Sequence, residues 1–238
     1  MLSLKNVCWM DASLPLLDDL SFDVAPGECI AIELADSRAV SVLIRLLTGE
    51  AALQTGSILV DGIPLKKLTP RLLQIYRRSI GVVLPMEKLL GNARIVDTIM
   101  LPLRAHRMRK NEILTRAKSL LTKLHMQEKE STLLQELPLD EQKCVALATA
   151  LVADPQILLI GNKQNDWPDE KNAERMHMLV REAMQRGTSV IIATCTSERF
   201  ASLHPRIISR NTEHNASRGT EEKSWKTTEK TRIIPIAL

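Results

Sequence analysis

Aromatic residues and cysteines are both scarce in this sequence of 238 residues. Three Trp, two Phe and one Tyr offer few rings on which bases could stack, so single-stranded nucleic acid is disfavoured and we expect no nucleic-acid partner. Four cysteines are too few for a disulfide scaffold. They include no C-x-x-C pair, so neither a zinc ribbon nor a redox motif is indicated. The four are Cys8, Cys29, Cys144 and Cys195.

Long hydrophobic runs and a strong charge of one sign are also absent. No stretch approaches the roughly 18 uncharged apolar residues that a membrane helix needs. The first residues, 1–5, do not have the basic segment and apolar run of a signal peptide. A formal net charge of +4 permits contact with anionic surfaces without requiring it. We therefore expect a soluble, intracellular protein.

The sequence does contain enough apolar residues, 45%, to build the core of one large domain. Short strand-like runs alternate with longer segments of helical periodicity. This alternation predicts an α/β fold with a largely parallel sheet and helices on its faces. Strands are expected at residues 29–34, 57–60, 80–84, 156–160 and 189–193, and helices at 40–47, 111–124, 139–152 and 170–185.

The middle of the chain differs from its flanks, because residues 86–150 have only helical patterns. We interpret them as a helical lobe inserted in the sheet. The lobe then lies between two parts of a core, 1–85 and 151–210, and the three parts together form one domain, 1–210.

The last segment, 211–238, is expected to be a disordered tail. Residues 211–231 are polar, nearly balanced in charge and without hydrophobic periodicity, so they bury too little surface to offset the entropy of ordering. The tail ends in the apolar run 232–238. That run is either functionless or a peptide that docks on a partner, and the sequence leaves both open.

Several motifs occur in a characteristic order. Gly56–Gly62 has the pattern G-x-I-x-x-D-G, Arg77–Val83 has R-R-x-I-G-x-V, and 146–159 combines an apolar helix with a buried strand. Over about 1–210, this order resembles the ATP-binding subunits of ABC transporters, closest to the branch of cell-division, lipoprotein-export and phospholipid-transport ATPases. The resemblance implies a P-loop NTPase-like (RecA-like) parallel core, an antiparallel N-terminal β part and an inserted helical lobe.

The same resemblance implies partners and a location. A subunit of this kind docks on a membrane permease through the groove between core and lobe. It pairs with a homologous ATP-binding subunit, as a homodimer or a heterodimer. It is cytoplasmic and peripheral to the inner face of the membrane.

The phosphate loop of the family is not conserved in this sequence. ATP binding needs G-x-x-x-x-G-K-[ST], because glycines let backbone N–H groups approach the phosphates and the lysine neutralises them. The run 34–41 stands at this position. Its first glycine is replaced by Leu34, its last by Ala39 and its lysine by Val40, and only Ser41, where Mg²⁺ would be bound, matches.

Charge within this run also speaks against phosphate. Asp36 puts a negative charge where a phosphate would lie, and Arg38, two residues before the lysine position, is the one cation that could reach it. Trp9 is the one aromatic residue near the position that stacks on adenine. The candidate cofactor-binding residues are Trp9, Ser37, Arg38, Ala39, Val40, Ser41 and Val42, with Ser41 as the candidate metal ligand.

The catalytic positions that the resemblance implies are replaced as well. Pro85 stands for the glutamine of the metal site, Gly161 for the metal-linked Asp, and Cys195 for the histidine that contacts the γ-phosphate. Asn162 replaces the glutamate that polarises water and cannot take up its proton. The run 137–142 lacks the serine and glycines of the L-S-G-G-x-Q signature. We therefore predict no catalytic residue.

These replacements lead to one hypothesis and two alternatives. The hypothesis is a pseudo-ATPase, which needs no cofactor and serves as a non-hydrolysing partner, scaffold or regulator. The first alternative is a divergent but working subunit that binds ATP and Mg²⁺ through Arg38 and Ser41 and orients water with Asn162. The second is the product of a decaying gene, which folds but has no role.

Overall fold

The computed structural model describes residues 1–83, 92–104, 108–162, 167–210 and 225–228. Pro85 and most of the predicted tail lie outside these residues. Within them, no helix is long and apolar enough to traverse a bilayer.

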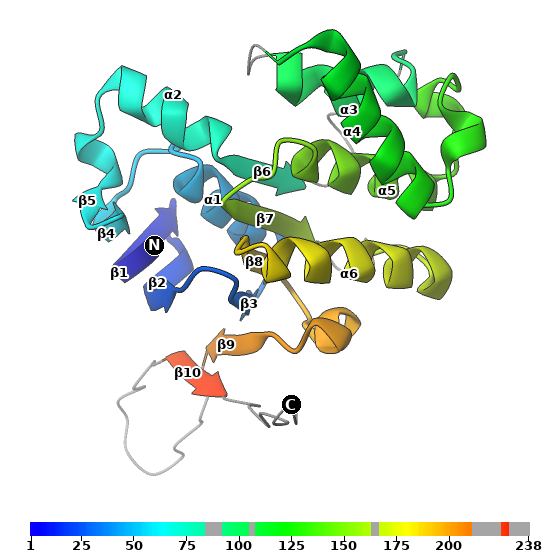
Figure 1. The fold of residues 1–238 in the computed structure, drawn as a ribbon. Helices are drawn as coiled ribbons and strands as arrows, with labels where there is room; N and C mark the ends of the chain where they lie inside the picture. Colours follow the sequence, from blue (N-terminus) through cyan, green and yellow to red (C-terminus); the bar gives the residue numbers. More distant parts are fainter. Residues whose placement is uncertain (84–91, 105–107, 163–166, 211–224, 229–238) are drawn as a thin grey trace, which may run out of the picture.

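A four-stranded antiparallel sheet forms the N-terminal part of the protein (Figure 1). It has the order β2-β1-β4-β5. Its strands are β1 (Leu2–Asp11), β2 (Leu14–Val24), β4 (Thr55–Val60) and β5 (Ile63–Pro64). The strand predicted at 57–60 is therefore part of this sheet, and the antiparallel N-terminal part that the resemblance implied is confirmed.

A six-stranded sheet of order β10-β9-β3-β8-β7-β6 forms the centre of the fold. All neighbours in it are parallel except β10 and β9. Its strands alternate in sequence with helices, as expected of a crossover fold. They are β3 (Cys29–Glu33), β6 (Ile80–Val83), β7 (Ile157–Asn162), β8 (Ser189–Thr194), β9 (Arg206–Arg210) and β10 (Trp225–Thr228).

Strand β10 differs from the expectation of a disordered tail, because Trp225–Thr228 pairs with the edge strand β9. Trp225 is half-buried against the core and donates its indole N–H to the carbonyl oxygen of Asp18 on β2, at 2.6 Å. A large ring that packs and satisfies its donor offsets the entropy of ordering four residues.

Two cores cover the two faces of the parallel sheet. One lies between this sheet and the antiparallel sheet and contains helix α1 (Ser37–Leu47). The other lies against the helical lobe, which gathers on one side of the molecule (Figure 1). Residues of β7 alternate between them, with Ile157 and Leu159 in the first and Leu158 and Ile160 in the second.

Among the remaining helices, those at 95–104, 110–123 and 139–151 lie in the expected helical lobe, whereas the helix at 70–78 was not predicted. Helix α6 (Glu170–Gln185) has the predicted bounds. The others are α2 (Pro70–Arg78), α3 (Ile95–Arg104), α4 (Lys110–Lys123) and α5 (Leu139–Leu151), with 3-10 turns η1 (Leu65–Lys67), η3 (Gln127–Lys129), η4 (Leu134–Glu136) and η5 (Glu198–Leu203).

Candidate functional site

The candidate site lies at the carboxyl ends of β3, β7 and β8. The register pairs Glu33 of β3 with Thr194 of β8, and Asn162 of β7 with the same Thr194. Helix α1 begins shortly after β3, at Ser37. Open α/β sheets bind ligands at this edge, next to a helix N-terminus.

The N-terminus of α1 is capped by the carboxylate of Asp36. Its Oδ1 accepts hydrogen bonds from the backbone N–H of Arg38 at 2.7 Å and of Ala39 at 3.0 Å. Asp36 itself is extended, with φ −149°, as an N-cap residue should be. This cap starts the helix at Ser37, three residues before the predicted 40–47. The N–H groups that would otherwise bind an anion are therefore bound to the chain's own carboxylate.

Electrostatics favour the ionised form of this cap. Partial burial raises the pKa of Asp36, but the hydrogen bonds from Ala39 and from Arg38 outweigh burial and hold the pKa below its ordinary 3.8. Asp36 thus supplies at neutral pH the negative charge that a helix N-terminus attracts.

The side chain of Arg38 is shared between two carboxylates. Its Nη2 lies 3.0 Å from Oδ2 of Asp36, and its Nη1 lies 3.5 Å from Oδ2 of Asp11, at the end of β1. Two negative charges thus surround the one cation of the loop. A phosphate that approached Arg38 would have to displace both carboxylates and meet their repulsion.

The other predicted cofactor-binding residues fall into two groups. Ala39, Val40 and Val42 are buried in the core between the two sheets, and Val40 is 1% exposed. The hydroxyl of Ser41 is on the exposed side of α1 and donates to the carbonyl oxygen of Ser37 at 3.1 Å. The structure brings Ser37, Arg38 and Ser41 together at the start of the helix and turns the others inward.

Trp9 lies on β1, half-buried against the core between the sheets. It pairs with Leu17 of β2. The structure thus places it on the same antiparallel sheet as Asp11.

The end of β7 has a different arrangement. Asn162 is 3% exposed, and its Nδ2 donates to Oγ1 of Thr194 at 3.2 Å. Its Oδ1 has no hydrogen-bond partner within the part of the chain that the structure describes. Gly161 is buried beside Ala193. Cys195 follows β8 and is half-buried.

Glu33 is a residue of this edge that sequence reasoning missed. Its Oε1 accepts from the backbone N–H of Ser197 at 3.1 Å and from the Ser197 hydroxyl at 2.6 Å. It therefore fixes the loop that carries Cys195 next to the end of β3. An acidic residue directly before the phosphate-loop position was the signal available in the sequence.

The signature position at the start of α5 is bound within the chain. One carboxylate oxygen of Asp140 accepts from the backbone N–H of Asp169 at 3.0 Å, and the other lies 3.4 Å from Nζ of Lys143. Leu139, beside it, is 66% exposed. Leu139 and Asp140 thus stand where the family signature has its two glycines, and Pro138 stands where it has the serine.

Metal-binding clusters are also absent from the described residues, in which no three His, Cys, Asp or Glu side chains are placed to hold an ion.

Comparison with known proteins connects this architecture to one family. The family model "ABC transporter" matches residues 17–162. An uncharacterized ABC transporter ATP-binding protein of Mycobacterium tuberculosis is 26% identical over 196 residues, which cover 80% of this chain and 79% of that protein. The cell division ATP-binding protein FtsE of Streptococcus pneumoniae is 28% identical over 198 residues, which cover 83% and 86%.

Solved structures support the fold. The dimeric structure of MJ0796, a bacterial ABC transporter cassette, superposes with a TM-score of 0.76 at 23% identity and covers 88% of this chain and 94% of that one. CbiO1 from Clostridium perfringens, part of the ABC transporter complex cbiONQ, superposes with a TM-score of 0.73 at 20% identity and covers 87% and 83%. The predicted fold class is confirmed, and because the family model spans more than half of its residues, the chain belongs to the ABC transporter family.

Proposed function

We propose that this cassette is a pseudo-ATPase, a subunit that does not hydrolyse ATP and serves as a scaffold or regulator of a membrane permease or of a homologous ATPase. One observation carries the proposal. The carboxylate of Asp36 occupies the backbone N–H groups of Arg38 and Ala39 at the start of α1, where a phosphate would bind in a competent cassette.

The donor set at the site does not suit ATP with Mg²⁺, which family members normally use. Magnesium prefers carboxylates and phosphate oxygens in octahedral geometry. The carboxylates at this edge are already engaged, Glu33 with Ser197 and Asp36 with the start of α1, and the hydroxyl of Ser41 is bonded to Ser37. No lysine ammonium is available at Val40. We derive no hydrolytic step from these residues, because phosphoryl transfer depends on positioned charge.

Partners follow from the family and remain part of the proposal. The neighbours include a dimeric cassette and a component of a multi-subunit transporter. We propose that this chain pairs with a permease and with a second cassette, in a cytoplasmic location peripheral to the inner face of the membrane. With Leu139 and Asp140 at its signature position, it would leave the partner's nucleotide without the usual contacts.

A calorimetric titration with ATP, with and without Mg²⁺, tests the nucleotide part of the proposal. We expect no heat of binding at millimolar ATP and no release of phosphate, and a cassette with an intact phosphate loop serves as positive control. Micromolar binding of ATP that requires Mg²⁺ would contradict the proposal that the phosphate site no longer binds nucleotide. Turnover by the purified chain would overturn the whole proposal.

The divergent ATPase is the second candidate, and one observation favours it. The Oδ1 of Asn162 is buried at the end of β7 and has no hydrogen-bond partner among the residues that the structure describes, so it could accept a hydrogen bond from a water molecule. This function requires the Ser41→Ala variant to lose turnover that the native chain has. Absence of ATP turnover in both the native chain and the Ser41→Ala variant would exclude the divergent ATPase and support the pseudo-ATPase.

A further inference from the structure

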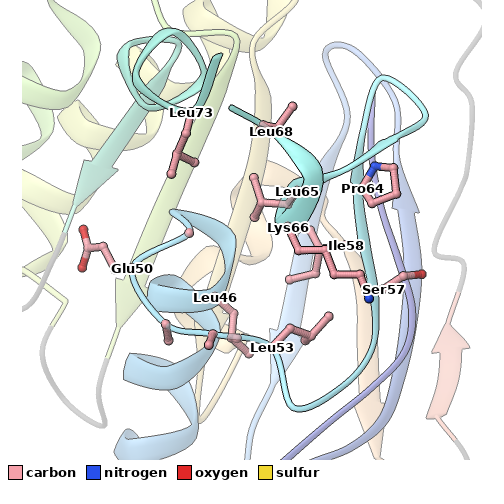
Figure 2. Close-up of a pocket in the computed structure, with 13 residues that line it drawn as sticks. Leu46, Glu50, Leu53, Ser57, Ile58, Pro64, Leu65, Lys66, Leu68 and Leu73 are labelled. Carbon is pink, nitrogen blue, oxygen red and sulfur yellow. The ribbon is translucent and has the colours of Figure 1, made fainter. Parts of the chain in front are cut away.

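A second cavity lies away from the candidate site, between the C-terminal end of α1 and the segment that joins β4 to α2 (Figure 2). Its volume is about 490 Å³, within the range of roughly 300–1,000 Å³ typical of small-molecule sites. In Figure 2, Leu65, Leu68 and Leu73 approach it from one side, and Leu46 and Leu53 from the other. We call this cavity the leucine groove.

Hydrogen bonds fix the loop that follows α1, which forms one wall of the groove, against α2. Gly49 has φ +68°, and a Cβ added there would lie 3.0 Å from Cδ1 of Leu73. Arg77 of α2 holds this loop through two hydrogen bonds, from Nε to the carbonyl oxygen of Thr48 at 2.9 Å and from Nη2 to that of Gly49 at 2.8 Å. The hydroxyl of Tyr76 donates to the carbonyl oxygen of Leu47 at 2.7 Å. The walls are thus fixed relative to each other before any ligand arrives.

The lining selects a flexible aliphatic ligand. No aromatic ring is among the described residues that line it, and Leu53, Leu65, Leu68 and Leu73 are only half-buried. Half-buried leucines around one concave surface leave apolar area in water, and covering that area is favourable. A saturated hydrocarbon chain matches these walls better than a planar ring, which would find no partner for stacking.

Charge at the rim selects the head of that ligand. Lys66 lines the groove and has no ion-pair partner among the described residues. From Gly62 to Val83 the sequence has five cationic residues and no Asp or Glu. The one acid of the lining, Glu50, stands on the other side in Figure 2. The positive potential therefore lies at the Lys66 end.

We propose that the leucine groove binds an amphiphile made of one aliphatic chain and one anionic head, with the chain against the leucines and the head at Lys66. This site is independent of the nucleotide question, because it shares no residue with the start of α1. A free carboxylate amphiphile and the acyl chain of an anionic lipid have the same chemistry, and the experiment separates these two sources.

Calorimetry with sodium decanoate, below the concentration at which it forms micelles, is the first test. We expect saturable binding to one site, and at least tenfold weaker binding of decyltrimethylammonium, which has the same chain and the opposite charge. Equal affinity for both amphiphiles, or no saturable binding of decanoate, would overturn the proposal.

Variants of exposed residues distinguish binding in the groove from nonspecific hydrophobic binding elsewhere on the surface. Lys66→Glu should weaken decanoate binding about tenfold, because it replaces attraction by repulsion at a solvated rim. Lys67→Glu is the matched control, since Lys67 is exposed but does not line the groove, and it should change the affinity less than twofold. Ala52→Phe, at an exposed lining position, should fill the groove and abolish binding while the protein stays folded. Equal effects of the two lysine variants would contradict the assignment.

An experiment with lipid vesicles distinguishes an anionic membrane lipid from a free amphiphile as the natural ligand. Co-sedimentation with phosphatidylglycerol vesicles that Lys66→Glu abolishes and Lys67→Glu does not would support an anionic lipid. Decanoate binding without co-sedimentation would support a free amphiphile. Co-sedimentation that both lysine variants leave intact would overturn a role of the groove at a membrane.

Discussion

The two ends of the candidate site differ in how their polar groups are satisfied. At the start of α1, the free N–H groups and the cation are matched by carboxylates of the chain, Asp36 and Asp11. At the end of β7, Asn162 is buried, its Nδ2 donates to Thr194, and its Oδ1 has no hydrogen-bond partner within the described ranges. A short acidic side chain can satisfy the N–H groups at a helix start when it reaches the backbone. At the end of β7, the neighbouring side chain of Thr194 meets the Asn162 donor, and no group of the described residues reaches its acceptor.

The strongest test of this difference is to return the missing lysine. Val40→Lys should lower the free energy of unfolding by about 3 kcal/mol, because the ammonium would enter an apolar core. It should not create ATP turnover, because Asp36 still holds the N–H groups. Urea unfolding and phosphate release measure the two effects.

The control for that variant is Ser41→Lys. Ser41 is exposed, so a lysine there should change stability by less than about 0.5 kcal/mol. ATP hydrolysis by Val40→Lys alone would show that the remaining replacements are dispensable, which contradicts the pseudo-ATPase.

In contrast to Asn162, the buried His177 has a hydrogen-bond partner for each of its two ring nitrogens. The indole N–H of Trp167 donates to Nε2 of His177 at 3.2 Å, and Nδ1 lies 2.7 Å from Oγ of Ser202. Indole can only donate, so Nε2 must be unprotonated and Nδ1 carries the hydrogen. The ring also stacks on Trp167, with centroids 5.7 Å apart. Protonation of Nε2 would break this arrangement.

Acid should therefore remove stability through His177. Burial, followed by the nearby charge of Arg181, lowers the pKa of His177 from 6.5 to about 4. Between these values the unfolded chain binds more protons, so this contribution is complete above pH 6.5 and declines as the pH falls to 4. The loss should reach about 3 kcal/mol. Chemical unfolding across this range measures it.

The His177→Phe variant is the control for the pH effect. It should be less stable at neutral pH, because it leaves the Trp167 N–H unpaired. Its stability should fall less steeply with acid over this range than that of the native chain. An identical pH dependence of the two proteins would assign the acid effect to other groups.

At the start of α1, removal of the cap should have a moderate effect. Asp36→Ala should destabilise the protein by about 1 kcal/mol, because the N–H groups of Arg38 and Ala39 lose their acceptor. Asp36→Asn keeps a capping oxygen and should cost only a few tenths of that. Thermal unfolding distinguishes them, and equal losses would mean that the charge, and not the hydrogen bonds, stabilises the helix.

At the end of β7, removal of the polar group should have the smallest effect and the opposite sign. Asn162→Leu should leave stability unchanged or raise it by about 1 kcal/mol, since it removes an unmatched buried oxygen. Thr194 keeps its bonds to the backbone of Thr196. The control Thr194→Val leaves the Asn162 amide without an acceptor and should destabilise. Marked destabilisation by Asn162→Leu would show that Oδ1 has a partner in solution.

Much of the framework could be predicted from local patterns. The buried runs of β3, β7 and β8 and the amphipathic α6 are long and periodic, so their existence did not depend on context. The start of α1 was predicted late, because Ala35, Asp36 and Ser37 read as a turn and helical periodicity begins only at Val40. The strand at Trp225–Thr228 was missed because it depends on an edge strand and on Asp18, far away in the sequence.

The sequence alone was enough to predict the family fold and to show which chemical groups are absent. The absence of a lysine or a glutamate can be read directly from the residue type at the corresponding position. The contacts that the remaining polar side chains make are visible only in the folded structure. Asp36 could be predicted to repel phosphate, but its use as a cap requires the extended φ of residue 36. The pairing of Arg38 with Asp11 requires β1 to end beside α1, and the hydrogen bond from Asn162 to Thr194 requires the register of β7 and β8. Long-range geometry sets the last two contacts, whereas the Asp36 cap joins neighbouring residues of the chain.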